Sequence, residues 1–244
     1  MASGELVPAA APCRLAVASY NVHRCIGGDG RHAPGRIAAV LRELDADVIG
    51  LQEVASRFDG AGAVDQLAWL AHATGFQAVA GPTLIAGRGH IGNALLTRCP
   101  ILQVRRIDLS VPRREPRGAL DVTIAADGVP VRVIVTHLGL RRSDRRAQVA
   151  RLLETLGNDC SAVALLGDIN EWLPRGGCLG RLHARLGPSA GVRSFPARRP
   201  LLSLDRVWVQ PRGALTALRA HASPLARLAS DHLPVRATIA WAPA

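Results

Sequence analysis

The chain has 244 residues, of which 48% are hydrophobic, and its formal net charge is +11. This length suffices for one large domain with a substantial buried core, and no stretch approaches the roughly 20 consecutive apolar residues of a membrane-spanning helix. All 30 basic residues are arginines; the codon bias of a GC-rich genome would account for the missing lysine but not for the positive excess. Because positive charge attracts polyanions and the planar guanidinium suits phosphate oxygens, DNA, RNA and anionic lipid head groups are all compatible partners.

The N-terminal segment and the cysteines indicate the compartment. Residues 1–12 lack the basic start and the apolar run of a signal peptide. We therefore expect residues 1–13 to form a flexible tail on a cytoplasmic protein, and residues 14–244 to form a single domain. The five cysteines are scattered, with no Cys-x-x-Cys pair, which argues against a zinc site or a disulfide scaffold.

Short apolar runs alternate with helical patterns along the first part of the chain. Residues 14–20 predict a buried strand, and residues 36–44 predict a helix with one apolar face. A second strand is predicted over 47–52, ending at Glu53, and a second helix over 64–74.

The rest of the chain predicts mostly strands. Two β-rich runs, 119–125 and 131–136, form a hairpin through Asp127 and Gly128, and a helix is expected over 143–156. The other strands are expected at 93–97, 101–109, 162–166, 204–209 and 235–241, and loops at 112–118, 174–180 and 196–200.

This mixture of hairpins and helices favours an α/β sandwich over a Rossmann fold. The glycine-rich segment 26–30 follows the first strand, but it has neither the lysine of a Walker loop nor the G-x-G-x-x-G spacing. The sequence therefore provides no nucleotide-binding signature.

Polar side chains recur where the apolar strands end. Each of them alone has an ordinary explanation, because Asp and Asn often serve turns and a histidine can be a hydrogen-bonded core residue. Together they supply carboxylates, amides and imidazoles, and the ends of packed strands can converge on one cleft. Oxygen-rich ligands of this kind suit a hard cation such as Mg²⁺ or Mn²⁺. The residues are Asn21, Glu53, His137, Asp168, Asn170, Asp205, Asp231 and His232.

Short motifs around these residues occur in a recognisable order between residues 14 and 241. They are SYNVHR at 19–24, LQEV at 51–54, GNALLTRCPI at 92–101, EPRGAL at 115–120, VTHLG at 135–139, GDIN at 167–170, LDRVWV at 204–209 and SDHLPV at 230–235. The combination resembles the endonuclease/exonuclease/phosphatase superfamily, whose DNase I-like fold implies a four-layer α/β/β/α sandwich. The motif HLGL, followed by Arg145 and Gln148, resembles a compact bacterial subgroup of that superfamily.

The resemblance implies a divalent-metal-dependent hydrolysis of phosphate esters by in-line attack of water. On the metal side, Glu53 matches the principal ligand of the ion. Asn21 matches the asparagine beside that ion, and Asp231 matches a further carboxylate of the metal site.

The same resemblance implies roles for the catalytic residues. Asp168 matches the carboxylate that orients or deprotonates the attacking water, and Asn170 matches the amide that contacts the phosphate. His232 matches the essential histidine, and Asp205 matches the carboxylate that pairs with it and raises its pKa. His137 matches a second histidine that binds the phosphate or stabilises the transition state.

Three further residues are predicted on the substrate side. Arg117 lies in EPRGAL, and Arg145 follows the THLGL motif, although arginines 141–146 are equally compatible with a solvated helix face. No acidic residue near Asn93 aligns with the carboxylate partner that the first histidine has in the pancreatic-DNase branch. We therefore expect Asn93 to take that place beside His137.

The leading functional prediction is a phosphodiesterase or nuclease, with nucleic acid slightly ahead of anionic phospholipid as substrate. The low aromatic content of 3% weakens the nucleic-acid prediction, because it provides few stacking platforms for single strands. The alternative is a metal-dependent phospholipid phosphodiesterase or phosphatase. A non-catalytic binding module on the same scaffold is a minor alternative, because every main site position is filled. We expect a monomer.

Overall fold

The structure is a computed structural model that describes residues 13–57, 64–87, 89–157, 162–173 and 176–241. The expected N-terminal tail lies outside the described residues except for Cys13. One set of strands comprises β1 (Cys13–Asn21), β2 (Val48–Arg57), β3 (Val64–Asp65), β4 (Gln77–Ala86), β5 (Gly89–Thr97), β11 (Leu215–Ala220) and β12 (Val235–Trp241). The other comprises β6 (Ile101–Asp108), β7 (Gly118–Ala126), β8 (Val129–His137), β9 (Ala162–Asp168) and β10 (Asp205–Gln210).

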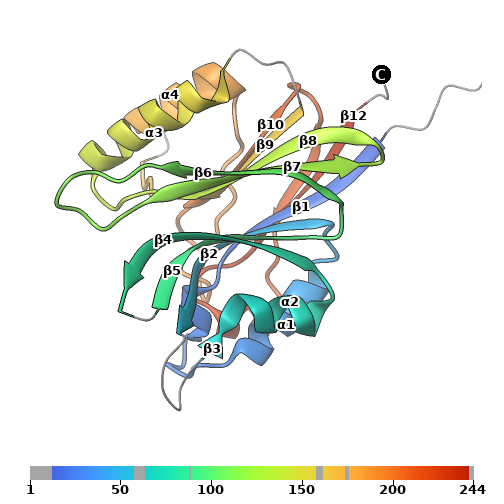
Figure 1. The fold of residues 1–244 in the computed structure, drawn as a ribbon, viewed down its shortest axis with the longest axis vertical. Coiled ribbons are helices and arrows are strands. Elements are labelled where there is room, and N and C mark those ends of the chain that lie inside the picture. Colours follow the sequence, from blue (N-terminus) through green and yellow to red (C-terminus); the bar gives the residue numbers. More distant parts are fainter. Residues whose placement is uncertain (1–12, 58–63, 88, 158–161, 174–175, 242–244) are drawn as a thin grey trace, which may run out of the picture.

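These strands form two sheets that pack face to face (Figure 1). The first has the order β11-β12-β1-β2-β5-β4, with β3 paired to β2, and the second has the order β10-β9-β8-β7-β6. Most neighbours are antiparallel, but β1 with β2 and β8 with β9 are parallel. Both sheets therefore contain parallel and antiparallel pairs.

Helices cover the outer face of each sheet (Figure 1). The helices are α1 (Pro34–Glu43), α2 (Gln66–Thr74), α3 (Arg142–Leu156), α4 (Gly177–Leu186), the short α5 (Ala226–Ala229) and a 3-10 turn, η1 (His23–Cys25). The helices α1 and α2 pack on the first sheet, and α3 and α4 pack on the second. The predicted four-layer α/β/β/α sandwich is confirmed. None of the described helices is long and apolar enough to cross a membrane.

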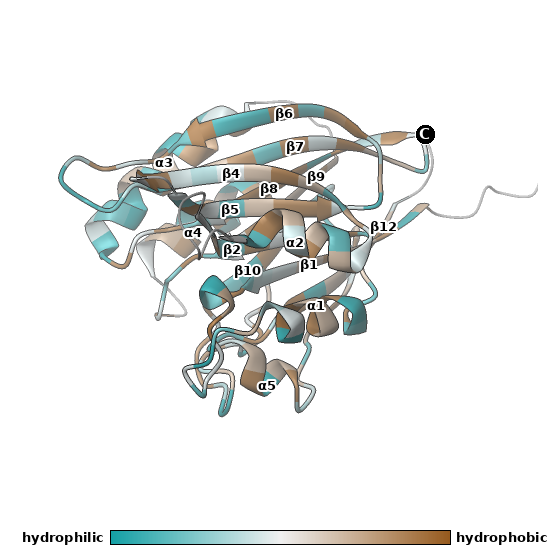
Figure 2. Cartoon of the chain, turned by 60° about the horizontal axis from the view of Figure 1, so that its bottom comes forward, coloured by the Kyte–Doolittle hydropathy of each residue, from teal (hydrophilic) through white to brown (hydrophobic). Residues whose placement is uncertain are grey.

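The apolar runs of the central strands follow from this layering. In β8, Val133 and Val135 belong to the cluster between the two sheets, whereas Ile134 belongs to the cluster under α3 and α4. Because both faces of such a strand are buried, the strand is apolar along its length instead of alternating. Figure 2 shows the contrast, with brown central strands and teal residues on the loops and on the edge strand β6.

The strand register brings the candidate residues together. His137 and Asp168, the last residues of the parallel strands β8 and β9, are paired directly. Asp168 is also paired with Asp205, the first residue of the antiparallel strand β10. Three polar residues from distant parts of the sequence therefore meet at one edge of the sandwich, close to the end of β1 at Asn21.

The structure also corrects several sequence-based expectations. The strand β4 was missed because it contains Gly81 and Pro82, which usually signal a turn. An edge strand tolerates this proline, which lies at a shift in the pairing with β5. Part of the expected loop 174–180 is the start of α4, whose glycines hid a regular apolar face of Leu179, Leu182 and Leu186. The strand β11 was missed as well, and β2 continues beyond Glu53.

Candidate active site

A cleft of about 290 Å³ opens where β1, β8 and β9 end. It is lined by most of the side chains that the sequence singled out, together with apolar residues on its margin. The lining residues are Asn21, Arg24, Glu53, Thr83, Ile91, Gly92, Asn93, Glu115, Arg117, His137, Leu140, Asp168, Asn170, Trp172, Phe195, Leu204, Asp231 and His232. Of the predicted site residues, Asp205 and Arg145 do not line the cleft.

Asp168 is a buried carboxylate at the centre of the cleft. Its Oδ2 accepts a hydrogen bond from the side-chain amide of Asn21 at 3.1 Å, and its Oδ1 accepts from the backbone N–H of Asn170 at 2.9 Å. The Nε2 atoms of His137 and His232 each lie 3.6 Å from Oδ2. Burial alone would raise the pKa of Asp168, but the charge of His232 and these hydrogen bonds outweigh burial and lower it, so the carboxylate is ionised at neutral pH.

His232 is a buried imidazole held by Asp205. Its Nδ1 lies 2.9 Å from Asp205 Oδ2, which also accepts a 2.5 Å hydrogen bond from the Ser194 hydroxyl. Burial lowers the pKa of His232, but the charges of Asp205 and Asp168 and the hydrogen bond to Asp205 raise it to about 10. The ring is therefore cationic at neutral pH, and its Nε2 faces Asp168.

The pKa of His137, in contrast to that of His232, is lowered. Burial lowers its pKa despite the nearby charge of Asp168. The Asn170 amide nitrogen, which also donates to the Leu138 carbonyl, lies 3.0 Å from His137 Nε2. Because the Asn170 amide nitrogen is the donor in this contact, His137 Nε2 is the acceptor, and the ring is neutral. Two histidines that approach the same carboxylate oxygen thus differ in charge, an arrangement that separates acid and base roles.

The partner of His137 is therefore Asn170, and the expectation for Asn93 was wrong in its detail. Asn93 does line the cleft, but its amide donates to the Gly118 carbonyl at 2.8 Å. The amide of Asn170 reaches His137 because Asn170 adopts a left-handed backbone, with φ of 53°. Asp168 and Asn170 do not lie on one extended segment, but both side chains line the cleft.

Glu53 owes its position to a break in β2. The pairing of β2 with β5 shifts between Leu51 and Val54, and Glu53 has a positive φ of 57°. Such a bulge re-aims a side chain, and a strained backbone at a cleft is typical of functional sites. Asn21 links this residue to the centre of the cleft, because its amide lies 3.2 Å from Glu53 Oε1 and 3.1 Å from Asp168 Oδ2.

The donor set fits a divalent cation. Glu53 accepts its one side-chain hydrogen bond from Asn21, and within the described residues no cationic side chain lies within 4.0 Å of it. The carboxylate of Asp231 also lines the cleft and is 39% exposed; its Oδ1 accepts a 3.3 Å hydrogen bond from the Ser230 hydroxyl and lies 3.8 Å from the His23 ring. Asp168 completes a set of oxygen ligands that hard cations prefer.

A second group of possible ligand atoms lies deeper. Asp168, Asp205 and His232 each bring one atom within 4.8 Å of the others. Here the carboxylate of Asp205 already binds His232 and Ser194, and a cationic imidazole does not bind metal. The cluster acts as a hydrogen-bonded unit, and the cleft carboxylates are the better metal site.

The two predicted substrate arginines differ in placement. Arg117 lines the cleft and pairs with Glu115 at 2.7 Å. Arg145 is buried, where it pairs with Glu171 at 3.2 Å and donates to the Leu140 carbonyl at 2.6 Å. The structure does not bring Arg145 to the cleft, because these buried acceptors hold its guanidinium inside the protein.

Sequence reasoning missed several residues of the cleft. Arg24 lines it from η1, where His23, Arg24 and Cys25 all have positive φ. SYNVHR contains Arg24, but only the fold turns it toward the cleft. Trp172 and Leu140 were also missed, because an apolar residue after a strand carries no signal of its own in a single sequence.

The chain matches the model of the Endonuclease/Exonuclease/phosphatase family over residues 18–232. It therefore belongs to the endonuclease/exonuclease/phosphatase family, whose members are hydrolases of the phosphoesterase and nuclease type. The chain is 31% identical to the uncharacterized protein YbhP of Escherichia coli K12, an alignment that covers 91% of this chain and 95% of that protein.

Solved structures are similar in fold. An endonuclease/exonuclease/phosphatase from Beutenbergia cavernae has a TM-score of 0.76 and 24% identity, covering 95% of this chain and 72% of that chain. A mannosyl-6-phosphatase from Bacteroides thetaiotaomicron has a TM-score of 0.73 and 18% identity, covering 91% of this chain and 98% of that chain. At these identities the likeness concerns the fold.

Proposed function

We propose that the protein is a divalent-metal-dependent hydrolase of phosphate esters, a phosphodiesterase whose active site is the cleft. One observation carries the proposal. The buried, ionised Asp168 lies 3.6 Å from Nε2 of both His232 and His137, next to the carboxylate of Glu53. Family membership supports the same class of reaction.

Glu53 and Asp231 would hold Mg²⁺ or Mn²⁺. Asn21 would position the Glu53 carboxylate beside the ion, because its amide nitrogen donates to Glu53 and its Oδ1 accepts from the His23 N–H. When bound, the ion supplies positive charge that neutralises the phosphoryl oxygens of the substrate. The carboxylate oxygens of Glu53 and Asp231 match the preference of both ions.

The residues of the chain then act on the phosphate and on the attacking water. Asp168 accepts a hydrogen bond from the water and orients it toward phosphorus, because its lowered pKa keeps it ionised. Cationic His232 stabilises the negative charge that develops on the phosphoryl oxygens. Asn170 donates its backbone N–H to Asp168 and its side-chain amide to His137, so it positions both the carboxylate and the imidazole for the reaction.

The guanidinium groups at the cleft provide further contacts for a phosphate. Arg117 and Arg24 both line it, and a planar guanidinium binds phosphate oxygens in a bidentate manner. The net charge of +11 supports nucleic acid as a substrate. The exposed Leu140 and Trp172 at the cleft favour the second candidate, a phospholipid phosphodiesterase or phosphatase.

A metal-dependent hydrolysis panel tests the proposal. It compares plasmid DNA, abasic duplex, RNA, cardiolipin, phosphatidylinositol phosphates and an aryl phosphodiester, each with Mg²⁺, with Mn²⁺ and with EDTA. We expect hydrolysis of at least one phosphodiester with metal, none with EDTA, and none by folded Asp168→Ala protein. Metal-independent turnover, or equal turnover by the Asp168→Ala variant, would contradict the proposed function.

A further inference from the structure

Exposed apolar side chains gather around the mouth of the cleft. Within the described residues, the large hydrophobic side chains that remain exposed are Trp69, Ile85, Leu102, Leu140, Trp172, Leu173 and Leu201. Leu140 and Trp172 line the cleft and are 71% and 60% exposed. Leu173 follows directly, and Leu201 lines a neighbouring hollow together with Trp172. We call Leu140, Trp172, Leu173 and Leu201 the apolar rim.

The apolar rim comes from three segments that are distant in the sequence. Leu140 lies between β8 and α3, Trp172 and Leu173 follow β9, and Leu201 precedes β10. Hydrogen bonds fix the backbone of each segment. Arg145 donates to the Leu140 carbonyl at 2.6 Å, the Leu173 N–H donates to a Glu171 carboxylate oxygen at 3.2 Å, and the Leu201 N–H donates to a carbonyl of its own segment at 2.8 Å. The apolar side chains are therefore presented outward by an ordered backbone.

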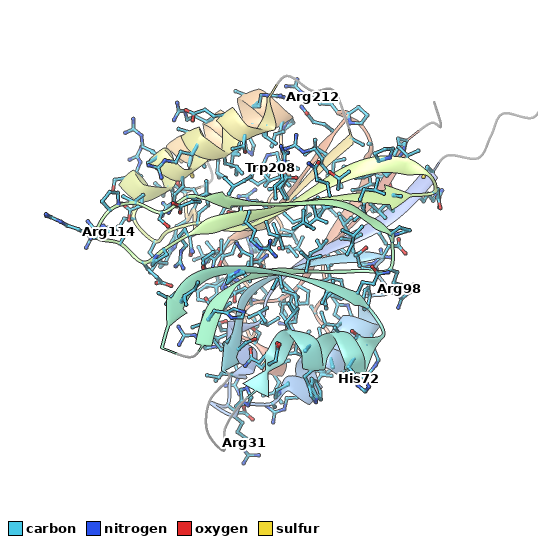
Figure 3. The ribbon with its side chains drawn as sticks, viewed as in Figure 1. Arg31, His72, Arg98, Arg114, Trp208 and Arg212 are labelled. Carbon is cyan, nitrogen blue, oxygen red and sulfur yellow. The ribbon has the colours of Figure 1, made fainter. Side chains whose placement is uncertain are left out.

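Arginines are interleaved with the apolar rim. Arg24 lies in the cleft, Arg141 shares a hollow with Leu140, and Arg193 shares one with Leu201. In the part of the chain that the structure describes, no carboxylate lies within 4.0 Å of these three guanidinium groups. Arg114 extends away from the loop between β6 and β7 (Figure 3) and has only a 3.6 Å contact to Asp144. This face thus combines apolar side chains with Arg24, Arg141 and Arg193, whose guanidinium groups form no ion pair within the described residues.

An anionic lipid surface matches both properties. Burying apolar side chains at the boundary between head groups and acyl chains stabilises the bound state, and arginines are attracted to the lipid phosphates. Nucleic acid matches only the charge. Nucleobases stack on aromatic rings, and three of the four rim residues are leucines, which have no ring. Exposed apolar side chains grouped beside a binding site are typical of an interaction surface.

We propose that the apolar rim and its arginines dock the cleft onto an anionic phospholipid bilayer, where the substrate is a phosphate ester of the lipid–water interface. This inference rests on the proposed function and names the substrate class of the same site. The apolar rim enters the head-group region, and Arg24, Arg141 and Arg193 contact lipid phosphates. The cleft then opens toward the phosphates of the membrane.

Vesicle sedimentation tests the docking without turnover. The full chain is mixed in EDTA with vesicles of phosphatidylglycerol and phosphatidylcholine, or with vesicles of phosphatidylcholine alone. We expect the protein to sediment with the anionic vesicles and less with the neutral ones, and salt to weaken the binding. Leu173→Ser/Leu201→Ser should lower the affinity for anionic vesicles about tenfold or more, whereas Trp69→Ser/Leu102→Ser, which changes exposed apolar residues on α2 and β6, should leave it unchanged.

Several outcomes would overturn the proposal. These are absence of binding to anionic vesicles, equal binding by the Leu173→Ser/Leu201→Ser protein, and loss of oligonucleotide binding instead of vesicle binding in that variant. A separate assay measures the rate of hydrolysis of a water-soluble aryl phosphodiester with Mg²⁺ or Mn²⁺. Because this substrate needs no membrane, the Leu173→Ser/Leu201→Ser protein should hydrolyse it at the same rate as the wild type. If the wild type hydrolyses no phosphate ester, the proposed function fails, and sedimentation alone still decides the docking.

Discussion

The Nδ1 atom of His232 lies 2.9 Å from Oδ2 of Asp205. This hydrogen bond joins the segment before β12 to the first residue of β10, and it directs the other ring nitrogen toward Asp168. The ring also packs against Phe195, with 4.8 Å between the ring centroids. A buried cation is thereby held beside the carboxylate at the centre of the cleft, and the charge of Asp205 is the main reason that it stays protonated.

Asp205→Asn should shift the pH dependence of the reaction. The pKa of His232 is about 10, so activity that needs the imidazolium persists at neutral pH and falls as the pH rises through that value. Without the carboxylate charge the pKa falls, and the alkaline limb of kcat/KM should move to lower pH. The same shift affects the stability of the fold. Because the pKa of His232 in the folded state lies above its ordinary value, protonated His232 adds its full contribution to the free energy of unfolding below about pH 6.5. That contribution is lost as the pH rises through about 10. An unshifted alkaline limb would show that His232 does not act as a cation.

His232→Ala and Asp168→Ala should each lower kcat/KM by about 10²–10⁴. The first removes the cation that stabilises phosphoryl charge, and the second removes the group that orients water. Steady-state rates on an aryl phosphodiester measure both losses, and circular dichroism checks the fold. Full activity in well-folded His232→Ala protein would remove the proposed mechanism.

Glu53→Gln should weaken metal binding on the order of 10–100-fold, because it removes the carboxylate that the bulge in β2 directs into the cleft. Since a ligand that binds only the folded state stabilises it, Mg²⁺ or Mn²⁺ should raise the Tm of the wild type in a thermal melt. The Tm of the variant should respond only at higher metal concentrations. Equal metal dependence of both proteins would exclude Glu53 as a ligand.

Arg145→Met and Arg117→Met should have different effects. Arg145 is buried against Glu171, and removing one partner of a buried ion pair lowers the free energy of unfolding by about 3–5 kcal/mol. Arg117 lines the cleft, so its loss should raise KM for a phosphate ester. Urea melts measure the first effect and kinetics the second. A rise in KM for Arg145→Met with unchanged stability would instead support its predicted contact with substrate.

Gly167→Ala should destabilise the fold by about 3 kcal/mol or more. A Cβ at this position would lie 2.0 Å from the Thr136 carbonyl oxygen, and the backbone has a φ of +155°. At Gly180, inside α4, a Cβ meets nothing within 4 Å. Gly180→Ala should therefore raise the free energy of unfolding by about 0.5–1 kcal/mol. Urea denaturation of the two variants beside the wild type measures both effects, and a stable Gly167→Ala protein would contradict the close approach of β8 and β9.

Much of the candidate site was visible in the sequence because its residues follow apolar runs. The runs before Asn21, His137 and Asp168 are buried strands, and each polar residue is the last residue of its strand. The pattern is local, since apolar side chains in succession mark a strand buried on both faces. The strands and the polar residues at their ends were therefore predictable from this pattern, and the four-layer arrangement was implied by the resemblance to the superfamily.

Tertiary structure alone decided which polar groups meet. The sequence offered Asn93 as the partner of His137 and Arg145 as a substrate contact, but the register of β8 with β9 brings Asn170 to His137, and buried carbonyls hold Arg145 inside. The bulge at Glu53 also escaped prediction. The physical reason is that each outcome depends on which buried donors and acceptors need partners, and those groups belong to segments that meet only when the chain has folded.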